Sequence, residues 1–162
     1  MKRVLAAASL TLLVATGAWT QDAKPDFSGT WSVDLAKSDF GPAPPPDSIV
    51  AVIDHKGSTI KIATTQKSAM GEVSNERTLT TDGKDNVNKM RTPAGDADMT
   101  STSKWDGRKL ITVSHMELQG TRITFNDSWE ISGDGKVLTI VRQVQMTPGE
   151  GFATTTVYNK QP

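Results

Sequence analysis

The sequence predicts an all-β protein, an antiparallel up-and-down meander that closes into a β-barrel of about 8–10 strands with little or no helix. Three observations predict this fold: strand-like segments in series, turn residues between them, and alternation of apolar and polar side chains. The C-terminal third shows the series most clearly. Its segments of roughly ten residues are Lys109–Leu118, Thr121–Ile131, Lys136–Met146 and Phe152–Tyr158.

Turn residues separate these segments and recur along the chain. Asp106-Gly107 and Asp134-Gly135 supply the positive φ angles that a tight hairpin turn requires. Comparable signals, among them Asp82-Gly83, recur about every 13 residues from Lys56-Gly57 to Pro148-Gly149, the length of one strand and its turn. Eight turns join nine strands, and a strand around Trp31 makes ten. Twisted sheets of this many strands tend to close. The sequence leaves open whether the first and last strands pair.

Alternation assigns side chains to the two faces of each strand, because successive residues of a strand point to opposite faces. One segment carries its large apolar residues on a single face: Ile123, Phe125, Trp129 and Ile131. The next segment carries a similar face with one cation in it: Leu138, Ile140, Arg142, Val144 and Met146. Nothing in the chain after residue 18 shows a helical apolar stripe.

Three middle segments are rich in Thr, Ser, Asn and charge: Ser74–Thr81, Asn86–Arg91 and Asp98–Lys104. Two interpretations compete for them. In the first, these strands line a polar side of the barrel lumen. In the second, they form a thinly packed edge of the sheet. The tendency of large twisted sheets to close favours the first.

The N-terminus has the three parts of a secretory signal. Lys2 and Arg3 give a charged start, Val4 to Val14 is apolar, and cleavage is expected after Ala18, or alternatively after Ala23. Residues 1–18 are therefore predicted to be a cleaved signal peptide and residues 19–162 a single domain. The chain has no Cys, and export without Cys predicts a bacterial periplasmic or secreted protein.

Charge excludes some classes of partner. Removal of Lys2 and Arg3 leaves 16 basic and 18 acidic residues, a net charge near −2. No basic patch stands out, so neither nucleic acid nor an anionic membrane surface is an expected partner. No membrane insertion is expected once the signal is cleaved.

Residues 35–47 interrupt the strand pattern. The run Phe40-Gly41-Pro42-Ala43-Pro44-Pro45-Pro46 excludes a sheet interior and a regular helix, because proline lacks the amide donor and fixes φ. We expect an ordered connection or lid, with a single helical turn at most.

Phe27-Ser28-Gly29-Thr30-Trp31 resembles the Gly-x-Trp signature on the first strand of the lipocalins and their calycin relatives. The resemblance implies that residues 19–162 form a lipocalin-like β-barrel in which Gly29 and Trp31 close one end. The ten-strand meander is also similar to the intracellular fatty-acid-binding proteins, which end in an Arg-x-Tyr pair that holds the ligand carboxylate. Tyr158 matches that Tyr, but Thr156 stands where the Arg would be.

Four residues are predicted to line the lumen and bind ligand: Arg142, Tyr158, Thr156 and Trp105. An inward guanidinium needs a partner. For Arg142 this is either the Trp31 ring with nearby carbonyls or a ligand anion. Tyr158 and Thr156 share a face of their strand, and Trp105 beside a turn is expected at a rim of the barrel.

No catalytic motif is present in the sequence. A Cys nucleophile, a Gly-x-Ser-x-Gly elbow and a Gly-rich phosphate loop are all absent. His55 and His115 are the only histidines and have no third ligand at a recognisable spacing, so no metal site is predicted. We expect no cofactor and no enzymatic activity.

Three function classes remain. The first is an exported carrier with a small apolar or amphipathic ligand in its lumen, which requires a cavity of at least ~300 Å³. The alternative is an envelope protein-interaction module with a filled interior, and the third is an enzyme acting inside the barrel. The carrier is favoured. The sequence names neither ligand, protein partner nor oligomeric state.

Overall fold

The computed structural model describes residues 23–92 and 94–162. The predicted signal peptide, residues 1–18, lies outside the described residues. Ten strands and one short 3-10 helix, η1, follow in order: β1 (Gly29–Val33), η1 (Leu35–Lys37), β2 (Ser48–Lys56), β3 (Thr59–Ser68), β4 (Gly71–Thr80), β5 (Asp82–Thr92), β6 (Gly95–Asp106), β7 (Lys109–Leu118), β8 (Thr121–Ile131), β9 (Val137–Thr147) and β10 (Phe152–Lys160). Across the described residues, no helix is long and apolar enough to cross a membrane.

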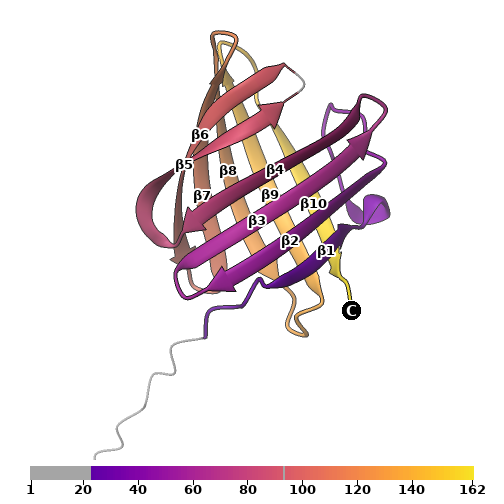
Figure 1. Ribbon diagram of the computed structural model, residues 1–162, viewed down its shortest axis with the longest axis vertical. Helices are drawn as coiled ribbons and strands as arrows, with labels where there is room; N and C mark the ends of the chain where they lie inside the picture. The colour runs from indigo at the N-terminus through magenta and orange to yellow at the C-terminus, as the bar shows by residue number, and fades with distance from the viewer. Residues whose placement is uncertain (1–22, 93) are drawn as a thin grey trace, which may run out of the picture.

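The strands form one antiparallel, nearly closed barrel (Figure 1). Within the sheet the order is β4-β3-β2-β1-β10-β9-β8-β7-β6-β5. The first and last strands pair, with Trp31 opposite Lys160, which answers the question that the sequence left open. The interruption lies between β4 and β5, consecutive strands that lie side by side in Figure 1 without a backbone ladder. The predicted all-β, up-and-down fold is therefore confirmed.

The predicted strand segments agree closely with the structure. β7 and β8 have the predicted bounds, and β9 and β10 differ by one or two residues at their ends. The turn predicted at Asp82-Gly83 lies one residue earlier, at Thr81, because β5 already begins at Asp82. Gly83 instead lies in a bulge of β5, where the register with β6 shifts between Asp82 and Asp85.

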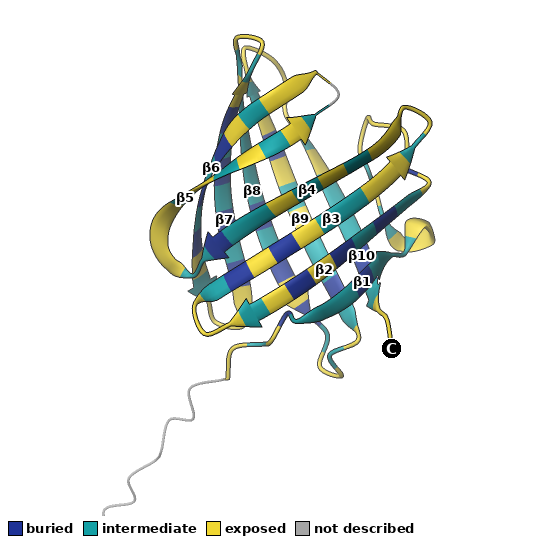
Figure 2. Cartoon of the chain, viewed as in Figure 1, coloured by how far each residue is buried: buried dark blue, intermediate teal, exposed yellow. Residues whose placement is uncertain are grey.

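Burial alternates along the strands as the sequence predicted (Figure 2). Trp129 and Ile131 on β8 are buried, and the intervening Glu130 is exposed. The same alternation runs through β7, where Leu110, Thr112, Ser114 and Met116 are buried. One face of every such strand therefore points into the barrel.

One end of the barrel is plugged by aromatic side chains. Phe27 and Trp31 have no exposed surface, and the Trp31 indole Nε1 donates to the Phe27 carbonyl at 2.9 Å. The Phe27 ring stacks on Trp105 at 5.7 Å between centroids and meets Trp129 edge-on at 5.8 Å. Edge-to-face and offset-stacked pairs of this kind are favourable beyond the area they bury. These rings form part of the packed core, together with buried aliphatic side chains such as Ile60, Leu79 and Leu110.

Gly29 is required at this end for two reasons. Its φ is +135°, where only glycine is free of strain, and a Cβ there would meet Lys160 Cε at 2.5 Å. The closeness brings the Lys160 ammonium over the Trp31 ring, at 5.2 Å from the centroid. The cation over Trp31 is therefore Lys160, whereas the sequence offered Arg142 as one candidate.

The Pro-rich connection is ordered against the other end of the barrel. Asp39 forms an isolated bridge with Thr155 of β10, with its amide donating to the Thr155 carbonyl at 2.7 Å. Gly41 follows at φ +62°, and a Cβ there would lie 2.9 Å from the Ala153 carbonyl oxygen. The chain then continues through the prolines, of which Pro46 is buried, into β2.

The polar middle strands were expected either to line a polar side of the lumen or to form an edge of the sheet, and different strands do each. The inner face of β6 is partly polar, because Ser101 and Ser103 lie between Met99 and Trp105, and its hydroxyls pair with β7. Ser101 and Ser114 hydroxyls lie 2.8 Å apart, and Ser103 and Thr112 hydroxyls 2.9 Å apart, all four residues being buried. β4 and β5 form the edges of the sheet instead. The hydroxyl pairs satisfy each other, which buried polar groups require.

Candidate functional site

A cavity of about 420 Å³ occupies the lumen at the end opposite the aromatic plug. Its wall combines a larger apolar set with two guanidinium groups and several hydroxyls. The lining residues are Phe40, Ala43, Pro44, Pro46, Ile49, Thr64, Gln66, Asn75, Arg77, Met90, Phe125, Ile140, Arg142, Val144, Phe152, Thr154, Thr156 and Tyr158. The Pro-rich connection thus contributes to the wall.

Arg142 of β9 pairs with Asp127 of β8 beside this cavity. Its Nε donates to Asp127 Oδ1 at 2.7 Å and its Nη2 to Oδ2 at 2.7 Å, a bidentate pair. The two residues are cross-strand partners in the ladder, which brings their side chains together on the inner face. The Asp127 side chain is 1% exposed, whereas that of Arg142 is 34% exposed. The carboxylate is therefore the buried member of the pair.

The same guanidinium also packs on an aromatic ring. Arg142 Cζ lies 4.8 Å from the centroid of Phe125, two residues before Asp127 on the same face of β8. Its charge is thus met by a carboxylate and by a ring face, both favourable for a partly buried guanidinium. The hydrogen bonds and charge of Asp127 outweigh the effect of desolvation, so the pKa of Arg142 is raised.

Arg77 of β4 is the second guanidinium at the cavity, and it has no comparable partner. Its Cζ lies 5.3 Å from the Trp129 ring centroid, across the lumen from its own strand. No carboxylate of the described residues lies within 4.0 Å of it. Desolvation, followed by repulsion from Arg142, lowers its pKa. The indole Nε1 of Trp129 is also buried without an acceptor among the described residues.

Tyr158 and Thr156 of β10 line the cavity, as does Arg142, so three of the four residues predicted to bind ligand share one wall. Burial raises the pKa of the Tyr158 phenol, against the opposing effects of Arg142 and Arg77. The phenol therefore stays protonated at neutral pH and can donate a hydrogen bond into the cavity.

Trp105, the fourth predicted ligand residue, lies elsewhere. It belongs to the aromatic plug, stacked on Phe27 and at 6.1 Å from the His55 ring, and it does not line the cavity. The Lys24 ammonium lies 5.5 Å from its centroid on the outer side. Its place beside the β6–β7 turn puts it at the plugged end, because Arg108 of that turn donates from Nη1 to the Ala23 carbonyl, on the approach to β1, at 3.1 Å.

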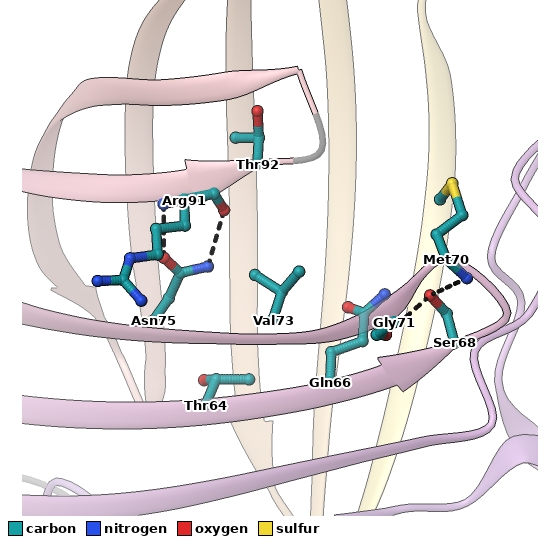
Figure 3. A pocket seen from close by; sticks show the side chains of 9 residues that line it. All are labelled: Thr64, Gln66, Ser68, Met70, Gly71, Val73, Asn75, Arg91 and Thr92. Atoms are coloured by element: carbon teal, nitrogen blue, oxygen red, sulfur yellow. Dashed lines mark hydrogen bonds between the residues drawn. The ribbon is translucent and has the colours of Figure 1, made fainter.

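A second cavity of about 280 Å³ lies at the rim, between the β3–β4 hairpin and the end of β5 (Figure 3). It shares Thr64, Gln66 and Asn75 with the larger cavity. Asn75 crosses the interruption between β4 and β5. Its Oδ1 accepts from the Arg91 amide at 2.7 Å and its Nδ2 donates to the Arg91 carbonyl at 3.1 Å, as Figure 3 shows.

Asn88 makes the reciprocal connection from β5. Its Oδ1 accepts from the Thr78 amide at 2.7 Å, and its Nδ2 donates to the Thr78 carbonyl at 3.0 Å. Each asparagine amide thus satisfies both backbone groups of one residue on the facing strand, as a ladder partner would. The interruption is bridged by side chains, and this satisfies part of both exposed edges.

The two histidines lie away from the cavity. His115 faces outward on β7, with Nδ1 3.0 Å from the Thr124 hydroxyl. His55 lies at the plugged end, where its Nδ1 accepts from the Phe27 amide at 3.3 Å. In the described part of the chain, no three His, Asp or Glu residues are grouped as a metal site would require.

Sequence reasoning missed Asp127 and Arg77. Asp127 occupies an inward position between Phe125 and Trp129, so alternation contained its signal. Counting back along the β8–β9 hairpin from Ile131 opposite Leu138 would have placed it opposite Arg142. For Arg77 the only sequence signal is that it lies two residues before Leu79 and so shares the inner face of β4. Its contact with Trp129 crosses the lumen, and strand pairing does not predict such a contact.

Comparison with models of known protein families found no match, and comparison with curated proteins found no similar sequence. The arrangement of the lumen is therefore the basis for inferring function. It can hold a small molecule with an apolar body and a polar group that accepts hydrogen bonds.

Proposed function

We propose that this protein is an exported, calycin-like carrier that binds a small amphipathic molecule in the lumen of its barrel. The observation that carries the proposal is the cavity of about 420 Å³, whose walls are apolar and polar in about equal parts, with the Arg77, Arg142 and Tyr158 groups among its lining. Ligand sites are typically cavities of about 300–1,000 Å³ with mostly apolar walls and a few convergent polar groups. The N-terminal signal pattern supports a bacterial periplasmic location for this carrier.

Two further observations favour a carrier over an interaction module. The packed core does not fill the whole barrel, so a cavity of about 420 Å³ remains in the lumen beside it. The exposed large apolar residues lie on separate elements, such as Val52 on β2, Val87 on β5 and Val141 on β9. Scattered apolar residues are ordinary on a monomer.

Native mass spectrometry of protein purified from the periplasm tests the proposal, with the denatured sample as reference. We expect an added mass that denaturation releases. A variant with a filled cavity, Ile140→Trp, should lose that mass, because Ile140 lines the cavity. Val141→Trp is the matched control, since Val141 is the next residue and is 40% exposed.

The outcomes distinguish the function classes. Loss of the added mass in Ile140→Trp, with retention in Val141→Trp, would support lumenal binding. Equal retention in both variants would contradict it, provided that thermal unfolding shows Ile140→Trp to be folded. A spectrum with no added mass, together with a dimer, would favour the interaction module.

A further inference from the structure

The hydroxyl groups inside the barrel differ in whether the protein itself pairs them. On β6 and β7 they pair with one another. The Ser101 and Ser114 hydroxyl oxygens lie 2.8 Å apart. Those of Ser103 and Thr112 lie 2.9 Å apart. A second set of neutral polar side chains lines the cavity, and among the described residues none of them makes a side-chain hydrogen bond: Thr64, Gln66, Thr154, Thr156 and Tyr158.

Tyr158 is the most deeply buried member of this second set. The residue is 8% exposed and lines the cavity, but its hydroxyl has no hydrogen-bond partner in the described part of the chain. A buried polar group normally has such a partner. For Tyr158 the partner therefore has to lie in the cavity, as part of a bound molecule or as solvent that a bound molecule displaces.

Three of the unpaired hydroxyls form a row along β10. Thr154, Thr156 and Tyr158 occupy alternate positions, so their side chains share one face of the strand at intervals of about 7 Å. Thr64 and Gln66 repeat this alternation on β3, where Gln66 is the more exposed of the two. The row on β10, at the half-buried and buried positions, is therefore the main polar surface that the cavity presents.

The charged groups at the cavity are stabilised by the protein and by solvent. Arg142 and Asp127 neutralise each other through two hydrogen bonds of 2.7 Å. The Arg77 side chain is partly buried and lies over the Trp129 ring, so solvent screens its charge and the ring face stabilises it further. The charges thus do not demand a ligand of opposite sign, and the unpaired hydroxyls are the groups that a ligand has to match.

On the basis of the carrier function proposed above, we propose that the ligand has a neutral head group with several hydroxyls, as in an alkyl glycoside, and that Thr154, Thr156 and Tyr158 recognise it. A hydroxyl donates one hydrogen bond and accepts up to two. Each protein hydroxyl of the row can therefore donate to one sugar hydroxyl and accept from another.

Other head groups match the row less completely. A carboxylate only accepts hydrogen bonds and an ammonium only donates them, so each uses one half of what these hydroxyls offer. A simple alcohol brings a single hydroxyl to a row of three. A site built to hydrogen-bond hydroxyls discriminates against an analogue that lacks them, because its own polar groups are then left unpaired.

The apolar part of the wall suits the rest of such a ligand. Phe40, Phe152 and Val144 are among the apolar residues that line the same cavity. The C–H groups of a sugar ring and of an alkyl chain pack against such side chains through dispersion. A cavity of about 420 Å³ lies near the lower limit for ligand sites, which favours one sugar ring with a short chain. We therefore choose octyl compounds as probes.

The experiment measures displacement of an apolar fluorescent probe by octyl glucoside, octanol and octanoate. All three are kept below the concentrations at which they form micelles, and the pH is held near 7, so that octanoate is ionised. Octyl glucoside should bind about ten- to a hundredfold more tightly than octanol, the range expected for a gain of two or three hydrogen bonds. It should also bind more tightly than octanoate.

Replacing threonine by valine removes the hydroxyl and keeps the shape of the side chain. The double variant Thr154→Val, Thr156→Val should reduce the preference for octyl glucoside over octanol by about tenfold. Thr155→Val is the matched control, because Thr155 lies between them on the opposite face of β10 and does not line the cavity. Tyr158→Phe removes the third hydroxyl and should lower the preference about fivefold. Valine and phenylalanine are both favourable in strands, and thermal unfolding checks that each variant is folded.

Three results would overturn the inference. Equal binding of octyl glucoside and octanol by the wild type would remove the hydroxyl-rich head group and leave the carrier function standing. Tightest binding of octanoate would assign the site to an anion instead. A preference for octyl glucoside that is the same in the double variant, in Tyr158→Phe and in Thr155→Val would remove the role of the β10 hydroxyls. Failure of the apolar probe and of all three octyl compounds to bind would contradict the carrier function itself.

Discussion

Removal of Arg142 should destabilise the fold through the carboxylate it leaves behind. In Arg142→Met, Asp127 loses both of its hydrogen bonds while its side chain remains 1% exposed. Breaking a buried ion pair by removal of one partner costs about 3–5 kcal/mol. Because 34% of the Arg142 side chain is exposed toward the cavity, we expect the lower end of that range, about 3 kcal/mol.

The assay is urea unfolding followed by tryptophan fluorescence, since Trp31, Trp105 and Trp129 all lie in the barrel. The midpoint should fall without a change in m value, and the melting temperature should drop by about 10 °C. The double variant Asp127→Leu, Arg142→Met should recover most of the loss, because the buried charge is gone. Arg122→Met on the outer face should change the unfolding free energy by less than ~0.5 kcal/mol.

The reasoning would be refuted by either of two results. One is an unfolding free energy for Arg142→Met within ~0.5 kcal/mol of wild type, which would mean that Asp127 does not depend on its partner. The other is a double variant as unstable as the single one. That result would assign the loss to the packing of Arg142 on Phe125 and leave the ion pair without effect on stability.

Two further predictions concern Tyr158 and Gly29. Tyr158 is the only tyrosine in the sequence, so an alkaline absorbance titration reports its phenol alone. We expect its pKa to lie above the ordinary value of about 10, because the side chain is buried. A titration midpoint below that value would contradict its burial. Because the folded-state pKa is raised, its contribution to stability should be complete below about pH 10 and lost as pH rises through the folded pKa. Gly29→Ala should cost about 1–3 kcal/mol in urea unfolding through its φ of +135° and its contact with Lys160. Adding Lys160→Ala to Gly29→Ala should relieve the contact but not the backbone strain, so only part of the lost unfolding free energy should return. Full recovery would show that the φ of residue 29 does not affect stability.

Much of the fold could be predicted because it depends on local patterns. The strands β7 and β8 follow from their turn residues and from alternation, which act within a few residues of chain. Arg142 could be singled out for the same reason, since it interrupts an apolar face of its own strand. The lumenal position of Arg142 therefore follows from the alternation of a single strand.

The remaining features depend on contacts between distant strands. The Arg77 guanidinium meets Trp129 across the lumen, and that contact depends on how the barrel closes, which alternation does not determine. The interruption between β4 and β5 is also non-local. Consecutive strands usually pair, and here the pairing is replaced by amide groups of Asn75 and Asn88, whose reach depends on the gap itself. The polar composition of these strands indicated an unusual region without indicating its geometry.

The aromatic plug and the residues next to it contribute to stability in opposite directions. At one end Phe27, Trp31 and Trp129 are buried together and supply the apolar packing that stabilises the fold. Next to this plug, the Arg77 guanidinium lies over the Trp129 ring with no carboxylate within 4.0 Å among the described residues, and the ladder between β4 and β5 is missing; both features cost stability. The aromatic plug offsets these costs and reaches the cavity through Trp129, whose ring lies under the partly buried Arg77 guanidinium. A guanidinium at this cavity, with no carboxylate partner among the described residues, supports the proposal that the lumen binds a ligand.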